Sequence, residues 1–97
     1  MSTWFVSRHP GALQWLRAQG IETDYQVDHL DLSRIAPGDR VLGTLPINLA
    51  AEVCARGAVY FHLSLVLPRE LRGQELDAED LHRLGARLDQ CRVVRAS

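Results

Sequence analysis

Three side chains able to do acid–base and anion chemistry follow one another in the run Ser7-Arg8-His9-Pro10-Gly11. A guanidinium can neutralise a phosphate through a forked hydrogen bond, and an imidazole can give or take a proton near neutral pH. Proline suits the first turn of a helix, whose free backbone N–H groups and dipole favour an anion. The run therefore predicts a phosphate-binding turn. The alternative is that Ser7 or His9 only caps the helix and that Arg8 is solvated.

A second run of this kind is Gly43-Thr44-Leu45-Pro46-Ile47-Asn48. Its proline again indicates that a helix begins, and Thr44 can either cap that helix or bind the same ligand. Asn48 can hold a base edge or a sugar hydroxyl, or can serve only as a polar residue of the first helical turn. Both alternatives stay open from the sequence.

Two polar residues, His62 and Ser64, interrupt an otherwise apolar stretch. Their spacing of two places them on one side of a strand, where each must find a partner. His62 is either a satisfied core histidine or a functional group, and Ser64, nearer the strand end, is the better ligand candidate. His29 and Asp31 lack a third metal ligand, so no metal and no cofactor is expected.

The composition is that of one ordinary small globular domain spanning residues 1–97, with 46% hydrophobic and 24% charged residues. The formal charge is -1, and all 11 basic residues are arginine, a composition typical of a GC-rich genome. Without a basic field we expect no duplex nucleic acid as partner, although a compact anion remains possible. The sequence contains no GxGxxG, Walker lysine, GxSxG or HExxH motif.

Two cysteines, Cys54 and Cys91, fall inside helical patterns and are expected to be buried reduced thiols. The N-terminus has no signal-peptide pattern, and no apolar stretch reaches the length of a membrane span. These features predict a cytoplasmic protein without a membrane partner.

The elements that must position these groups alternate between strands and helices. Periodicity and turn residues predict strands over 3–7, 25–30, 40–44 and 58–66, a helical turn over 32–35, and helices over 10–20 and 45–56. A last helix begins after Asp77 as N-cap, with Leu76 stapled onto Leu81, and it is expected to bury four residues: Leu81, Leu84, Leu88 and Cys91. Val93 and Val94 suggest a short terminal strand.

This order predicts an α/β fold, a single small Rossmann-like domain with a mainly parallel sheet and helices on its faces. In such sheets ligands bind beyond the carboxyl ends of the strands, where the strand order reverses. Residues 7–11, 43–48 and 62–64 are therefore expected to form one site.

The three runs Trp4 to Ala12, Gly43 to Ala50 and Phe61 to Leu65, taken in this order, resemble a small CRISPR-associated family called Csx sixteen, which accompanies type III CRISPR systems. The resemblance covers almost the whole chain. It implies a Rossmann-like ring nuclease that linearises cyclic oligoadenylate, with cyclic tetra-adenylate as the expected substrate. It also implies a homodimer that holds the ring across its two-fold axis and needs no metal.

Under this resemblance the ribose 2'-hydroxyl attacks the adjacent phosphodiester and leaves a 2',3'-cyclic phosphate and a 5'-hydroxyl. Arg8 would stabilise the phosphorane, His9 would act as general acid or base, and Ser7 would orient the phosphate. The remaining ligand-binding candidates are Gly11, Thr44, Asn48 and Ser64.

Two other functions fit the same residues. A protein with this pocket can bind cyclic oligoadenylate as a sponge, without cleaving it. The Arg8-His9 pair after a strand also resembles the Arg-His-Gly start of histidine phosphatases, although Pro10 separates His9 from Gly11 and the chain is far shorter than those enzymes.

Overall fold

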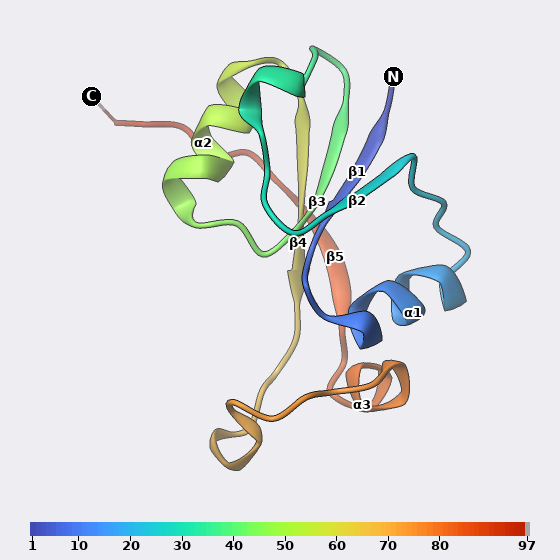
Figure 1. The fold of residues 1–97 in the computed structure, drawn as a ribbon. Helices are drawn as coiled ribbons and strands as arrows, with labels where there is room; N and C mark the ends of the chain where they lie inside the picture. The colour runs from blue at the N-terminus through green and yellow to red at the C-terminus, as the bar shows by residue number, and fades with distance from the viewer. Residues whose placement is uncertain (97) are drawn as a thin grey trace.

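The computed structural model describes residues 1–96, which form one five-stranded sheet with helices on both faces (Figure 1). Its strands are β1 (Thr3–Val6), β2 (Tyr25–Val27), β3 (Arg40–Gly43), β4 (Val59–Ser64) and β5 (Arg87–Cys91). They lie in the order β2-β1-β3-β4-β5, and every neighbouring pair is parallel except β4 with β5. The predicted α/β class with a mainly parallel sheet is confirmed. The chain moves outward in opposite directions from β1 and β3, so the strand order reverses between them.

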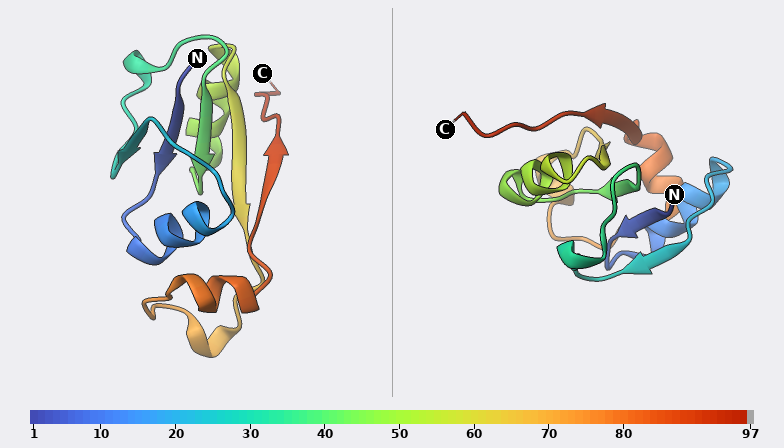
Figure 2. Two further views of the ribbon diagram at one scale, coloured as in Figure 1. Left: turned by 90° about the vertical axis from the view of Figure 1, so that its right-hand side faces the viewer. Right: turned by 90° about the horizontal axis from the view of Figure 1, so that it is seen from above.

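The helices divide between the two faces of the sheet (Figure 2). Helices α1 (Pro10–Ala18) and α3 (Ala78–Arg83) pack on one face, and α2 (Ile47–Ala55) packs on the other. Short 3₁₀ turns cover Leu32–Arg34 and Arg69–Leu71. Within residues 1–96 none of the helices has the length and apolarity needed to cross a membrane.

Successive residues of a strand point to opposite faces of the sheet, so each strand contributes side chains to the core on both faces. In β1, Trp4 packs with Val53 of α2, whereas the next residue, Phe5, packs with Leu16 of α1. Each of these side chains is at most 4% exposed. Because neighbouring residues of β1 pack on opposite faces of the sheet, both faces hold the backbone of this strand in place. Ser7 follows directly after the strand.

The C-terminal prediction is wrong after residue 83. Residues 87–91, expected to continue the last helix, form β5, which pairs antiparallel with β4. The helix ends because Gly85 adopts a φ of 73°, the left-handed conformation that commonly follows a helix. The unpaired N–H and C=O groups along the edge of β4 then favour a strand over a longer helix. Cys91 is accordingly in a strand, and Val93 and Val94 lie beyond its end.

The start of the sheet is tied together by Asp39, which is 4% exposed. Its carboxylate accepts hydrogen bonds from the Ser2 amide at 2.9 Å, the Ala36 amide at 3.0 Å and the Trp4 indole Nε1 at 3.2 Å. The backbone N–H of Ser2, followed by that of Ala36, lowers the pKa of Asp39 below its ordinary value. The charged form is therefore the one that the fold stabilises.

Asp39→Asn is expected to lower the thermal midpoint at neutral pH and to flatten its dependence on acid. A depressed pKa contributes stability above the ordinary carboxyl value, and this contribution is lost as pH falls through the folded pKa. Thermal melts between pH 2 and pH 7 measure both effects. Asp28→Asn, at an exposed position, serves as the control. Equal acid sensitivity of the Asp39 variant and the unchanged protein would contradict this role.

Candidate functional site

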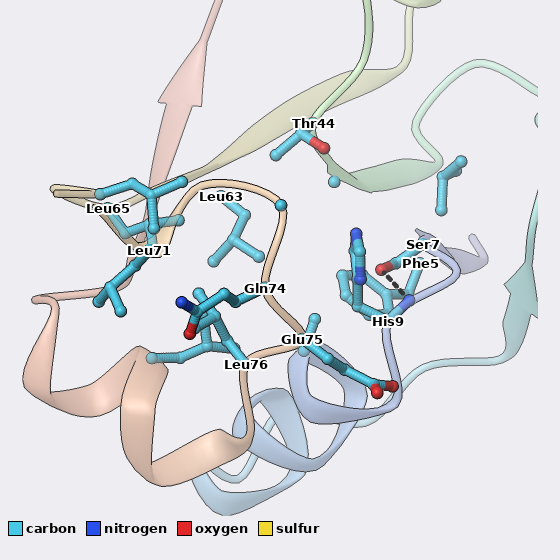
Figure 3. A pocket seen from close by; sticks show the side chains of 16 residues that line it. Phe5, Ser7, His9, Thr44, Leu63, Leu65, Leu71, Gln74, Glu75 and Leu76 are labelled. Carbon is cyan, nitrogen blue, oxygen red and sulfur yellow. Dashed lines mark hydrogen bonds between the residues drawn. The ribbon is translucent and has the colours of Figure 1, made fainter. Parts of the chain in front are cut away.

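A cavity of about 620 Å³ opens at the C-terminal ends of β1 and β3, where the strand order reverses (Figure 3). This is the position at which open α/β sheets bind ligands. Ser7 and His9 line it from the end of β1, and Thr44 lines it from the end of β3. The first two of the three predicted segments are thus brought together on the side of the sheet that carries α1, and the third reaches the cavity through Leu63 of β4.

Ser7 is held by the edge strand β2. Its N–H donates to Val27 O at 3.0 Å, and its carbonyl accepts from Gln26 Nε2 at 2.7 Å. The His9 N–H donates to Ser7 Oγ at 3.1 Å, which closes a tight turn between strand and helix. The hydroxyl accepts this bond and still has its own proton to donate, so Ser7 can hold the turn and contact a ligand oxygen.

His9 is the N-cap residue of α1, but its side chain makes no capping hydrogen bond. Figure 3 shows its ring directed into the cavity. Pro10 brings no N–H to the helix terminus, and the His9 N–H is bonded to Ser7. The terminus therefore offers fewer backbone donors than the sequence suggested, and a ligand at this turn depends more on the side chains.

Thr44 is exposed in the turn between β3 and α2, and it does not cap that helix, whose N-cap is Pro46. The turn leaves the sheet at Gly43, where an added Cβ would meet Val6 O at 2.6 Å. Only glycine allows the ends of β1 and β3 to approach so closely. This contact sets Thr44 beside the end of β1.

The other candidates lie outside the lining of the cavity. Arg8 is exposed next to it, and Asn48 is exposed in the first turn of α2. Gly11 is buried beneath the residues that precede α3, with its Cβ position 2.1 Å from Leu76 O. Ser64 shares the α2 side of β4 with Tyr60, because the strand pleat alternates. Ligand contacts by these residues remain predictions.

The outer wall of the cavity was not predicted. It consists of the segment between β4 and α3, which contributes leucines, Gln74 and Glu75: the leucines are Leu65, Leu67, Leu71 and Leu76. No site residue was expected in this segment from the sequence. The repeated leucines in that segment were the signal, because a solvated loop has no need of several large apolar side chains.

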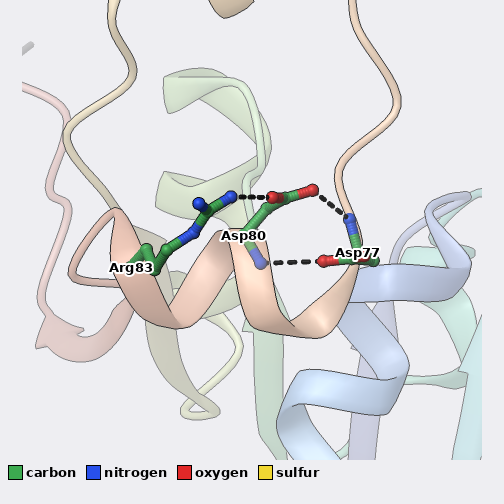
Figure 4. A network of polar contacts seen from close by, with 3 residues as sticks. All are labelled: Asp77, Asp80 and Arg83. Carbon is green, nitrogen blue, oxygen red and sulfur yellow. Dashed lines mark hydrogen bonds and ion pairs between the residues drawn. The ribbon is translucent and has the colours of Figure 1, made fainter.

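A capping box fixes the far end of this wall (Figure 4). The Asp77 carboxylate accepts from the Asp80 amide at 2.8 Å, and the Asp80 carboxylate accepts from the Asp77 amide at 3.1 Å. Arg83 pairs with Asp80 on the same helix. The Asp77 N–H, and then Arg83, lowers the pKa of Asp80 below its ordinary value. The predicted N-cap at Asp77 is confirmed. Its hydrogen bonds fix the backbone next to Leu76, the last leucine of the wall.

The cavity combines an apolar interior with a small polar rim. No arginine is among the residues that line it within 1–96, and Glu75 adds one acidic group. The same residues contain no cluster of three or more His, Cys, Asp or Glu side chains that could hold a metal ion. The arrangement suits a flat apolar group inside the cavity, with hydrogen-bonding and proton-transferring groups at its mouth.

One family match covers almost the whole of this architecture. A family model described as "putative CRISPR-associated protein (Cas_VVA1548)" matches residues 4–94. No curated protein and no solved structure matches the chain. The matched range includes β1 from Trp4 onward, the Ser7–His9 turn, the β3–α2 turn and the outer wall, and the chain belongs to this family of CRISPR-associated proteins.

Proposed function

We propose that the protein is a ring nuclease of the Csx sixteen type, which binds cyclic oligoadenylate in this cavity and linearises it. The observation that carries the proposal is the convergence of Ser7, His9 and Thr44 at the reversal point of the sheet, in a chain of a CRISPR-associated family. Cyclic tetra-adenylate in the cytoplasm is the proposed substrate.

The two regions of the cavity match the two parts of a nucleotide. Phe5, Leu63 and the wall leucines offer an apolar interior for an adenine ring. The Ser7–His9 turn and Thr44 at the rim would face ribose and phosphate. A ring of four nucleotides exceeds a cavity of about 620 Å³. We therefore propose that two copies of the chain hold the symmetric ring about a two-fold axis.

The chemistry needs one proton removed and one supplied. The 2'-hydroxyl gives up its proton as O2' attacks phosphorus, the P–O5' bond breaks, and O5' takes a proton. His9, whose ring is not engaged in capping, would perform one of these transfers. Arg8 stands next to the cavity and would swing in to stabilise the phosphorane, while the free Ser7 proton would orient a phosphate oxygen.

A second candidate function, binding without cleavage, is favoured by one observation. The guanidinium of Arg8 does not line the cavity, so the group that would stabilise the transition state is not in place before a ligand binds. A sponge needs only the apolar interior and the rim.

Incubation of the purified protein with an excess of cyclic tetra-adenylate in EDTA tests both functions. Linear products with 2',3'-cyclic phosphate and 5'-hydroxyl ends, formed over many equivalents, support the nuclease. Bound but intact ring supports the sponge. Turnover of a generic phosphomonoester, with the ring untouched, would instead favour a histidine-type phosphatase and overturn the proposal.

Glu75→Gln is expected to tighten binding of the anionic ring by up to about fivefold, because the substitution removes a negative charge from the lining of the cavity. The effect should shrink as the salt concentration is raised, since the Glu75 carboxylate and the phosphates of the ligand would both be near solvent. Fluorescence titration of cyclic tetra-adenylate at two salt concentrations measures it. Glu79→Gln, at an exposed site on α3 outside the lining, is the matched control. Weaker binding by the Glu75 variant would indicate that this carboxylate contacts the ligand directly.

A further inference from the structure

The hydroxyl of Tyr60 is bonded on both sides of Thr44. It accepts a hydrogen bond from the Leu45 N–H at 2.9 Å and lies 3.2 Å from Gly43 O. Tyr60 itself is 2% exposed, on the α2 side of β4. The Tyr60 hydroxyl thus contacts the backbone immediately before and after Thr44, the cavity residue that follows β3.

The same hydroxyl lies 2.7 Å from Nδ1 of His62, which is partly exposed. A phenol has one proton, and burial raises the pKa of Tyr60, so the proton stays on the oxygen near neutral pH. Two acceptors compete for that proton: Nδ1 of His62 and the carbonyl of Gly43.

The protonation state of His62 decides between these acceptors. When the imidazole is neutral with its proton on Nε2, the shorter contact has Tyr60 donating to Nδ1. When the imidazole is charged, Nδ1 carries a proton and donates to the phenol oxygen, because both ring nitrogens are then donors. The phenol then donates its proton to Gly43 O. Tyr60 is in this state hydrogen-bonded to the turn on both sides of Thr44, as donor to Gly43 O and as acceptor from the Leu45 N–H.

We propose that Tyr60 and His62 are positioning residues that set the β3–α2 turn, and with it Thr44, according to the protonation state of His62. Neither residue lines the cavity. The importance of this coupling for cleavage rests on the proposed function, whereas the coupling itself is a property of the free protein.

Charged and titratable groups from the neighbouring elements face the Tyr60–His62 pair. Asp89 of β5 is the cross-strand partner of His62, and the Ser64 hydroxyl, helped by Arg87, lowers the pKa of Asp89 so that it remains an anion. Arg87 Nε also bonds Asp89 at 3.2 Å. Cys54 of α2 and Cys91 of β5 lie near the phenol of Tyr60. The β3–α2 turn contributes only backbone groups to this hydroxyl.

The test is an NMR titration of the protein without ligand, between pH 5 and pH 8. The ¹⁵N shift of Thr44, whose amide shares its peptide group with Gly43 O, is expected to follow the midpoint of the His62 ring. His62→Gln keeps a polar side chain but removes the titration, so the Thr44 shift should become flat. His9→Gln is the matched control, and it should leave the Thr44 titration in place.

Tyr60→Phe should uncouple the two groups, so that His62 still titrates while Thr44 does not. In the cleavage assay His62→Gln should remove one limb of the pH–rate profile. A Thr44 shift that stays flat in the unchanged protein while His62 titrates would overturn the proposal, and so would a Thr44 titration lost only in His9→Gln. If the coupling is present but the ring is not cleaved, the proposed function fails and the positioning pair stands.

Discussion

Replacing His9 by alanine is expected to slow cleavage of cyclic tetra-adenylate by about 10²–10⁴-fold, the usual contribution of a general acid or base. Binding of cyclic tetra-adenylate should weaken far less, because the His9 imidazole lies at the rim of the cavity and the substitution leaves the apolar interior unchanged. Arg8→Ala should damage both binding and turnover, since a guanidinium attracts the phosphate in the ground state and more strongly in the transition state.

Single-turnover kinetics and equilibrium binding on the same variants separate these effects. His82→Ala on α3 and Arg17→Ala on α1 remove a histidine and an arginine from exposed positions outside the cavity, and they serve as matched controls. Unchanged turnover in both His9→Ala and Arg8→Ala would show that this turn is not the reaction centre, whatever the ring does elsewhere on the protein.

The turn itself could be predicted because its signals are local. The aromatic and β-branched residues before Ser7 favour a strand, and Pro10 suits the first turn of a helix. The structure begins α1 at Pro10 as predicted. The junction at Gly43 was predicted for the same reason, with a strand ending at a glycine and a helix following a proline.

The end of the last helix could not be predicted from local pattern alone. Leu81, Leu84 and Leu88 fit the spacing of a helix, but Leu88 also fits an alternating strand. The choice was made by Gly85 and by the open edge of β4, which lies more than twenty residues away in sequence. A non-local pairing of this kind leaves no periodic signal in the residues that it recruits.

The membership of the site was partly predictable. The carboxyl ends of parallel strands meet at one edge of the sheet, which is why Ser7 and Thr44 were expected in one site. The structure places them after the neighbouring strands β1 and β3. Ser64 lies at the carboxyl end of β4, as expected. Its side chain is on the α2 side of the sheet, however, because successive residues of a strand alternate between the two faces. The wall leucines lie in a segment without regular period, and only the folded chain brings them over the cavity.

The contact that holds this wall in place gives the second large prediction. Gly11→Ala should destabilise the protein by about 3 kcal/mol, at the upper end of the usual cost of overpacking. An added Cβ would lie 2.1 Å from Leu76 O and 2.8 Å from the Asp77 Cα, and neither backbone atom can move alone. Helix propensity predicts the opposite sign, since alanine is favoured over glycine within a helix by about 1 kcal/mol.

Urea unfolding of the Gly11 variant therefore decides between packing and propensity. Gly20→Ala is the matched control: Gly20 has a φ of 77° and open space around it, so its substitution isolates a backbone cost of about 1–2 kcal/mol. Because Leu76 lines the cavity and Asp77 caps α3, the Gly11 variant should also bind the ring more weakly, whereas Gly20→Ala should bind it normally. A Gly11→Ala protein as stable as the original would mean that α1 and the wall do not touch in solution, and the cavity would then lack its outer side.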